Sequence, residues 1–213
     1  MADLLREDFS LARPRSISDE QILQTARDCF LEHGPAVSTE VIAQQLGVSP
    51  QALFKRFHSK QELMLEALAP EEPARWIPKV AAGPDDRDLS VQLKEILTEL
   101  AEFFMDISRR MSVLRWGNVD FDQLLARYAE PPPLVEIRAL AGWFERAFDR
   151  GLIRSVDCRA MAMLVLTAMH GPAMLTDMLS QHPTGHSQEE YVEIIVEVLL
   201  RGLLNEVCGK GFE

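Results

Sequence analysis

The polar residues whose types and spacing suggest a chemical use lie close together, between positions 38 and 60. Gln51, Lys55 and Arg56 fall within two helical turns of one another. An amide and two cations at this spacing suit a duplex, because amides hydrogen-bond base edges and cations contact phosphates. The residues therefore indicate recognition of a polyanion rather than covalent chemistry.

Motifs for catalysis are missing from the sequence. There is no G-x-S-x-G elbow, phosphate-cradling glycine loop or H-E-x-x-H helix. His182 and His186 are four residues apart and precede two glutamates, so a metal site is conceivable. Pro183 and Gly185 between them favour a loop instead. We expect no enzyme activity, metal or cofactor, and keep the two histidines as the alternative.

The elements that must position the amide and the cations are two short helices, residues 39–46 and 50–57. Their apolar seams are Ile42, Ala43 and Leu46 in the first helix, and Leu53, Phe54 and Phe57 in the second. Gly47 is suited to end the first helix, and Ser49 with Pro50 is suited to start the second. The pattern is typical of a helix-turn-helix, although a three-helix module that only packs has the same signals.

The flanking helices have start signals of their own. Ser18 and Gln21 form a predicted capping box at the start of a helix over residues 18–33. Ser59 and Glu62 form a second predicted box before a fourth helix that begins at Lys60. The first 70 residues thus divide into an arm, 1–17, and a compact helical unit, 18–70.

This unit resembles the tetracycline-repressor-like (TetR) family of transcriptional regulators. The resemblance rests on Ala26, Phe30, Gly34, Ser38, Thr39, Ile42, Ala43, Gly47, Val48, Ser49, Leu53, Phe54, Phe57, Lys60 and Leu63. The family implies a homodimer that represses, or less often activates, transcription from a double-stranded DNA operator. It also implies a carboxy-terminal helical domain that binds a small-molecule effector.

The resemblance assigns DNA contacts position by position. The expected contacts are Arg13, Arg15, Ser38, Thr39, Ser49, Pro50, Gln51, Ala52, Phe54, Lys55, Arg56 and Lys60. Thr39 and Lys60 correspond to phosphate contacts, and residues 50–52 correspond to base contacts. The two arginines sit in a flexible arm that either enters a minor groove or is simply solvated. Phe54 replaces the usual tyrosine, Gln51 replaces a common glycine, and Glu40 replaces a residue that is often polar or basic, so the operator sequence cannot be read from these positions.

Composition limits the class of protein. The chain has 213 residues and a formal net charge of −11, which opposes nucleic-acid binding overall. Cations gathered beside the predicted helix-turn-helix can still attract a nucleic acid at that surface, and they predict salt-dependent binding. Cys29, Cys158 and Cys208 form no close pair, which indicates a reducing cytoplasm. We expect no secretory signal and no membrane span, because the apolar run at residues 160–169 is too short.

The remainder, residues 71–213, reads as a helical bundle, so the fold class is all-α. Proline, glycine and charge between residues 70 and 88 predict a loop or a broken helix. Helical periodicity then continues from Leu89, in a shorter helix around residues 121–125, and over residues 134–150, 159–179 and 189–204. The triproline at 131–133 is expected to terminate the shorter helix, and Pro172 is expected to kink or break its own helix.

Two sites are expected in this bundle. A broad apolar stripe on the last two helices predicts a four-helix dimer interface formed by Met163, Leu166, Thr167, Tyr191, Ile194, Ile195, Val198 and Leu199. An excess of aromatic and methionine side chains predicts an apolar effector pocket formed by Phe103, Phe104, Met111, Trp116, Trp143, Met169, His170 and Met174. For either set, burial in the core of a monomer is the alternative.

The sequence therefore predicts a cytoplasmic, ligand-responsive DNA-binding regulator, most simply a repressor. It acts as a homodimer, and an apolar or amphipathic molecule in residues 71–213 modulates operator binding. The alternative is a helical interaction or small-molecule-binding protein that has kept the fold without sequence-specific DNA binding. Phe54 and the acidic balance of the chain keep that alternative open.

Overall fold

The structure is a computed structural model that describes residues 17–204. Within that range the regular structure is helical and contains no strand, as the all-α prediction requires. The helices are α1 (Asp19–His33), α2 (Thr39–Leu46), α3 (Pro50–Phe57), α4 (Lys60–Leu68), α5 (Ile77–Ala81), α6 (Leu89–Trp116), α7 (Phe121–Leu125), α8 (Pro132–Asp149), α9 (Cys158–Leu179) and α10 (Gln188–Leu203). Arg13, Arg15 and Cys208 lie outside the described residues.

Serine caps start each of the first four helices where the sequence predicted. The Ser18 hydroxyl accepts from the backbone N–H of Gln21 at 3.2 Å, and the Gln21 side chain accepts from the Ser18 N–H at 3.1 Å. The hydroxyls of Ser38, Ser49 and Ser59 accept in the same way from the backbone three residues on. Each such cap contributes about 0.5–2 kcal/mol, so the helix starts are well defined.

The second expected capping box, at Ser59, is only half formed. Ser59 Oγ accepts from the Glu62 N–H at 3.0 Å, but the Ser59 N–H donates to the Phe57 carbonyl. His58 ends α3 with a positive φ of 54°, and this tight turn directs the Ser59 N–H backwards. The Glu62 side chain therefore has no N–H to accept from at this helix start.

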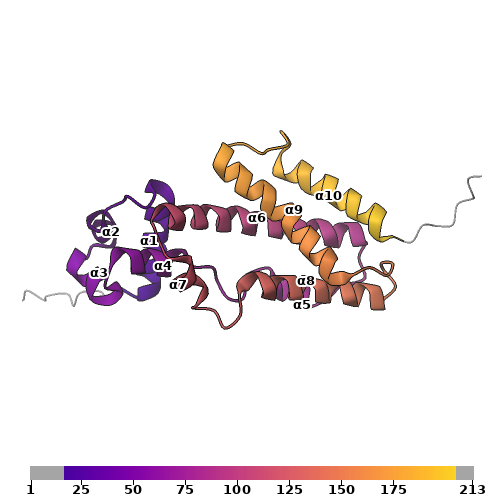
Figure 1. Cartoon of the computed structure of the whole chain (residues 1–213), viewed down its shortest axis with the longest axis horizontal. Coiled ribbons are helices and arrows are strands. Elements are labelled where there is room, and N and C mark those ends of the chain that lie inside the picture. Colours follow the sequence, from indigo (N-terminus) through magenta and orange to yellow (C-terminus); the bar gives the residue numbers. More distant parts are fainter. Residues whose placement is uncertain (1–16, 205–213) are drawn as a thin grey trace, which may run out of the picture.

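Two hydrophobic cores lie along the molecule, and α6 runs between them (Figure 1). The first is formed by α1–α4, together with Leu114 near the end of α6 and Leu124 on α7. The second is formed by the segment around Trp76 and α5, and by α6, α8, α9 and α10. Consequently α6 and α7 belong in part to the amino-terminal unit, although they follow residue 70 in the chain.

Residues 70–88 contain one short helix, α5, between two fixed loops. Trp76 is fully buried just before α5, and Arg146 on α8 donates to the Val80 carbonyl at 2.7 Å. The buried Gln92 side chain accepts from the Asp85 N–H at 2.8 Å and donates to the Arg87 carbonyl at 2.7 Å. These side chains satisfy the loop backbone, so the segment holds α6 against α8 rather than acting as a free linker.

The sequence predicted a kink or a break at Pro172, and no break occurs: α9 is continuous from Cys158 to Leu179. A proline lacks the N–H that would bond the carbonyl four residues earlier, here that of Ala168. The Tyr191 hydroxyl of α10 donates to that carbonyl at 3.0 Å. The freed acceptor is thus satisfied by the neighbouring helix, which lies alongside α9 (Figure 1).

The triproline also acts differently from the expectation. α7 already ends at Leu125, and α8 begins at Pro132, two residues earlier than the sequence indicated. Proline suits the first turn of a helix because its missing N–H needs no partner there. The triproline therefore starts α8 instead of terminating α7.

Among residues 17–204, one helix is long and apolar enough to cross a membrane by length and composition. It is α9, with 22 residues and a mean hydropathy of 1.2. The sequence expectation of no membrane span considered only the apolar run at residues 160–169, whereas here the test applies to the whole helix, Cys158–Leu179. In this structure α9 packs on α6 and α8 as a bundle helix, so one such helix is weak evidence for a membrane.

Candidate DNA interface and effector pocket

The α2–α3 unit has the geometry of a helix-turn-helix. Gly47 ends α2 in the left-handed conformation, with φ 68° and ψ 29°, and Pro50 occupies the first turn of α3. Leu53 and Phe57 of α3 are buried against the other helices of the unit. The opposite side of α3 is therefore free to face a partner.

The outward side of α3 carries most of the residues predicted to contact DNA. The exposed residues of this side are Gln51, Ala52, Phe54, Lys55 and Arg56, beside the capping Ser49 and the half-exposed Pro50. Phe54 is 40% exposed, although the sequence placed it on the apolar seam. An exposed aromatic ring at this position contributes contact area but no hydroxyl.

Arg56 is engaged within the protein, which the sequence did not indicate. Its Nη1 donates to the Ile17 carbonyl at 2.6 Å and lies 2.9 Å from Asp19 Oδ1. The guanidinium thus ties the end of α3 to the start of α1. Arg56 therefore has a partner within the chain, on a surface where both side chains remain exposed.

The starts of α2 and α4 supply the second group of predicted contacts. Ser38 caps α2, and Thr39 beside it is only 7% exposed. Lys60 is the first residue of α4 and is half-buried. The pKa of Glu40 is lowered by hydrogen bonds from its own backbone N–H and from Ser38, with a smaller contribution from Lys60. Free N–H groups at helix starts attract phosphates, whereas the Glu40 carboxylate opposes them.

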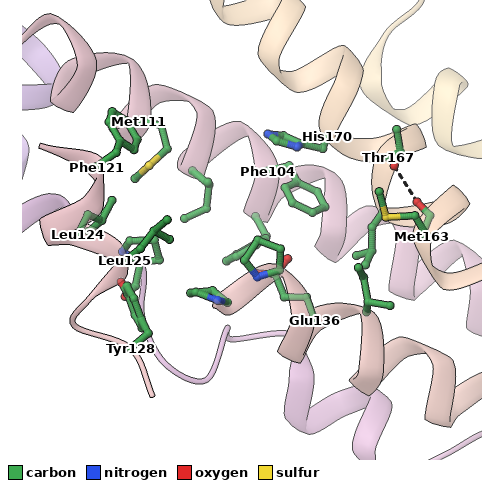
Figure 2. Close-up of a pocket in the computed structure, with 17 residues that line it drawn as sticks. Phe104, Met111, Phe121, Leu124, Leu125, Tyr128, Glu136, Met163, Thr167 and His170 are labelled. Carbon is green, nitrogen blue, oxygen red and sulfur yellow. Dashed lines mark hydrogen bonds between the residues drawn. The ribbon is translucent and has the colours of Figure 1, made fainter. Parts of the chain in front are cut away.

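An apolar cavity lies between α6, α7, α8 and α9, and Figure 2 shows the side chains around it. Its volume is about 330 Å³, within the usual range for small-molecule sites. The lining residues are Pro70, Phe103, Phe104, Ile107, Met111, Phe121, Leu124, Leu125, Tyr128, Pro132, Pro133, Glu136, Ile137, Met163, Leu166, Thr167 and His170.

Half of the predicted effector residues line this cavity: Phe103, Phe104, Met111 and His170. The other four do not. Trp116 ends α6 and is 78% exposed, and Met174 faces outward from α9. Trp143 and Met169 are fully buried, and Trp143 packs edge-to-face on Phe144 with ring centroids 5.4 Å apart. Helical periodicity identified them as large and apolar, but it cannot distinguish core from cavity wall.

His170 forms part of the cavity edge. Its ring stacks on Phe104, with centroids 4.9 Å apart and an interplanar angle of 23°. The covered face of the imidazole loses water, and this partial burial lowers the pKa of His170. The imidazole is therefore neutral near pH 7.

Glu136 is the functional candidate that the sequence reasoning missed. It lies on the buried side of α8, four residues before Leu140, and is 8% exposed. Burial raises the pKa of Glu136 to about 7. The sequence does contain a signal for this residue, namely a glutamate on the apolar side of the predicted helix. Such a position is unusual, because charged residues are seldom buried without a partner.

The predicted dimer residues divide between an outer apolar face and the interior. Met163 and Val198 are more than half exposed, and Thr167 and Ile194 are also exposed. Leu166 and Leu199 are buried in the core of their own chain, and Tyr191 and Ile195 are packed partly against it. Met163, Leu166 and Thr167 additionally line the cavity, so this part of α9 belongs to two sites.

The outer face extends beyond the residues expected from sequence. We define the α9–α10 face as the exposed apolar side chains of these two helices, namely Met163, Leu164, Met174, Leu175, Met178, Leu179, Ile194 and Val198. Such a contiguous apolar surface on two neighbouring helices is characteristic of an interaction site. It is the second surface, after that of α3, that the fold leaves for a partner.

Comparisons with known sequences and structures show which proteins this chain resembles. Residues 22–67 match the family model of bacterial regulatory proteins, tetR family. Over 90 residues the chain is 33% identical to the HTH-type transcriptional repressor BdcR of Escherichia coli K12, a match that spans 42% of this chain and 46% of BdcR. It is 26% identical over 180 residues to the HTH-type transcriptional repressor AcnR of Corynebacterium efficiens, which spans 84% and 88% of the two proteins.

A solved structure extends the similarity to the whole fold. A Mesorhizobium loti protein assigned to the TetR-family regulators superposes with a TM-score of 0.68 and 20% identity, covering 88% of this chain and 96% of that one. Residues 22–67 therefore match the TetR family, and the chain as a whole shares the fold of that solved structure. The matched residues comprise most of α1 and all of α2 and α3, and they end within α4.

The similar proteins are regulators rather than enzymes. Within residues 17–204, no group of three or more His, Cys, Asp or Glu side chains is arranged to hold a metal. His182 instead has Nδ1 2.8 Å from the Thr184 hydroxyl, in the loop before α10. The loop assignment made from Pro183 and Gly185 agrees with this arrangement.

The cavity and the α1–α4 unit share a wall. Leu124 of α7 lines the cavity and belongs to the core of α1–α4. Tyr128, also in the wall, donates to the Pro70 carbonyl just after α4 at 2.8 Å. The neighbouring Arg127 pairs with Glu66 of α4 at 2.5 Å. A change in the cavity therefore has a short route to α4.

Proposed function

We propose that this protein is a homodimeric transcriptional repressor whose binding to a double-stranded DNA operator is modulated by a small apolar or amphipathic effector. The single observation that carries the proposal is the shared wall between the cavity and the helix-turn-helix unit. A cavity with no contact to that unit would serve ligand binding alone. Here α7 touches both, so occupancy and DNA recognition can be coupled.

In the proposed DNA complex, α3 enters the major groove. Gln51 and Ala52 face base edges, Lys55 and the start of α3 lie toward phosphates, and Thr39 and Lys60 hold phosphates at the starts of α2 and α4. Arg56 acts chiefly by fixing α1 against α3, as its bond to Asp19 suggests. The acidity of the rest of the chain, net −11, weakens non-specific binding.

The proposed dimer forms through the α9–α10 face. Two copies of α9 and α10 would make a four-helix arrangement that buries apolar side chains left exposed in one chain. A two-fold dimer places two α3 helices at a fixed separation, which matches the half-site spacing of an operator. We infer a cytoplasmic location, where such an operator is accessible.

The proposed effector response is a tilt of α4. A ligand that moves α7 would act on α4 through the contacts of Tyr128 with Pro70 and of Arg127 with Glu66. The tilt changes the separation of the two α3 helices. To oppose operator binding tenfold, the ligand must prefer the non-binding arrangement by about 1.4 kcal/mol.

Fluorescence anisotropy with labelled genomic fragments, at low and at moderate salt, tests the DNA-binding part. We expect binding at low salt that weakens as salt rises, and selected fragments that contain two related half-sites one or more helical turns apart. Absence of binding even at low salt would contradict the proposal. That result would favour a helical interaction protein that has kept the fold without DNA binding.

A further inference from the structure

The Glu136 carboxyl has an unusual position in the cavity wall. It projects from the first turns of α8 into the space below Phe104 (Figure 2), and the residue is 8% exposed. Within the described residues 17–204 it has no hydrogen bond and no ion pair, although Glu130 nearby in the sequence pairs with Arg138 on α8. Glu136 is thus a nine-tenths buried acid in the wall of the cavity.

The rest of the wall offers no compensating charge. Its other polar side chains are Tyr128, which donates to Pro70 at 2.8 Å, Thr167, which donates to the Met163 carbonyl at 2.8 Å, and His170 at the edge. Partial burial lowers the pKa of His170, which disfavours a positive charge on its imidazole. A buried carboxyl without a partner is costly, and proteins keep such groups where a ligand completes them.

We propose that the effector is a lipophilic amine, with an apolar body between α6 and α9 and a protonated nitrogen that donates to the Glu136 carboxylate. The ring of Phe104, stacked on His170, supplies the apolar surface beside that nitrogen. An organic anion of the same shape would meet the carboxylate and be rejected. The assignment rests on the cavity being the effector site, and it names the chemical class that this site selects.

Three probes with the same carbon chain separate charge from hydrophobicity: decylamine, decanol and decanoate. Isothermal titration calorimetry on the full chain at pH 8, without DNA, measures their affinities. We expect decylamine to bind at least about tenfold more tightly than decanol, since a charge-assisted hydrogen bond in a dry site is strong. Decanoate should bind more weakly than decanol. Equal affinities for the amine and the alcohol would overturn the proposal.

Two variants test whether Glu136 is the residue that causes the preference for the amine. Glu136→Gln keeps the shape but removes the charge, so it should abolish the preference for the amine and change decanol affinity by less than about twofold. Glu130→Gln is the matched control, because this acid pairs with Arg138 away from the cavity, and it should retain the preference. A Glu136→Gln protein that still prefers the amine would contradict the assignment.

The pH dependence of amine binding to the wild-type chain is an independent test. Because the pKa of Glu136 is about 7, amine affinity should fall severalfold from pH 8 to pH 6 while decanol affinity stays constant. The other titratable groups of the wall are Tyr128, whose pKa is raised by burial, and His170, whose pKa is lowered. α6 contributes only apolar side chains to this wall. An amine affinity that does not vary over this range would overturn the proposal.

These measurements do not involve DNA. If decylamine shows no preference but operator fragments bind in anisotropy, the regulator proposal stands and the ligand class is wrong. If the amine preference holds but no DNA binds, the cavity assignment stands and the regulator proposal fails.

Discussion

Glu136 carries a titratable carboxyl in a place where a negative charge is poorly solvated. Burial raises its pKa from 4.5 to about 7, so between those pH values the native chain holds a proton that the unfolded chain has released. The stability of the wild type must then fall as pH rises through this interval. Relative to Glu136→Gln, we expect a loss on the order of 2 kcal/mol between pH 5 and pH 8.

Urea unfolding of both proteins at pH 5, 6, 7 and 8, at one protein concentration, measures this difference. Glu130→Gln serves as a control, because hydrogen bonds from Arg138 lower the pKa of Glu130. That variant should lose rather than gain stability relative to the wild type above pH 5. A stability difference between wild type and Glu136→Gln that does not depend on pH would contradict the assigned environment of Glu136.

Gln51 and Lys60 should contribute to DNA binding in different ways. Gln51 is exposed on the outer side of α3, so Gln51→Ala should relax sequence preference and cost about 1–3 kcal/mol on the preferred operator. Lys60→Ala should weaken binding to all sequences similarly and reduce the salt slope by about 1. Anisotropy titrations on matched and scrambled operators over a salt series distinguish the two. If Gln51→Ala leaves sequence preference unchanged, α3 is not the reading helix.

At the scale of elements, α9 and α10 are joined by the bond that compensates for Pro172. Tyr191→Phe removes the hydroxyl that donates to the Ala168 carbonyl at 3.0 Å, and leaves that acceptor without a partner in the helix. We expect a loss of about 1 kcal/mol or more in the free energy of unfolding. Pro172→Ala restores a backbone N–H that can bond the same carbonyl.

A double-mutant cycle tests this compensation. Tyr191→Phe should cost clearly less in the Pro172→Ala background than in the wild type, because the carbonyl then has its helical donor. Chemical denaturation of the four proteins supplies the coupling energy. Additive effects of the two substitutions would mean that the tyrosine stabilises α10 by packing alone.

The helices themselves could be predicted because their signals are local. Serine caps and apolar spacing placed the starts of α1 to α4, and periodicity placed the long helices within two residues. The failures involve contacts between distant segments. A kink or a break was expected at Pro172, because the donor that satisfies the Ala168 carbonyl comes from Tyr191, nineteen positions after the proline. The pairing of Arg56 with Asp19 was not expected either, because the two residues lie on different helices.

The cavity was predicted only in part, for a related reason. Spacing shows that Phe104, Trp143 and Met169 face inward, but packing alone decides that Phe104 borders a space and that the other two fill the core. The contribution of α7 and Tyr128 depends on how a loop folds back over α6. The unusual position of Glu136 could have been recognised from the sequence, because this residue interrupts an apolar stripe on α8.

At the scale of the whole molecule, the α9–α10 face should control DNA binding at a distance. Val198 lies in this face and is 60% exposed in a single chain. Val198→Glu places a charge where two copies would meet, so burying it without a partner should prevent dimer formation. It costs little in the folded monomer, because the side chain is already in water. The expected product is a folded monomer with intact α1–α4.

Such a monomer retains one α3 but loses simultaneous engagement of two half-sites. Joining two modest contacts raises overall affinity by about 10²–10⁴, so operator affinity should fall by a factor in that range. Light scattering after gel filtration gives the mass, and anisotropy gives the affinity. Val91→Glu is the control, because Val91 is 43% exposed on α6 and is not one of the side chains of this face, and that variant should remain dimeric. A Val198→Glu protein that is still a dimer, or a monomer with undiminished operator affinity, would show that this face does not set the spacing of the two reading helices.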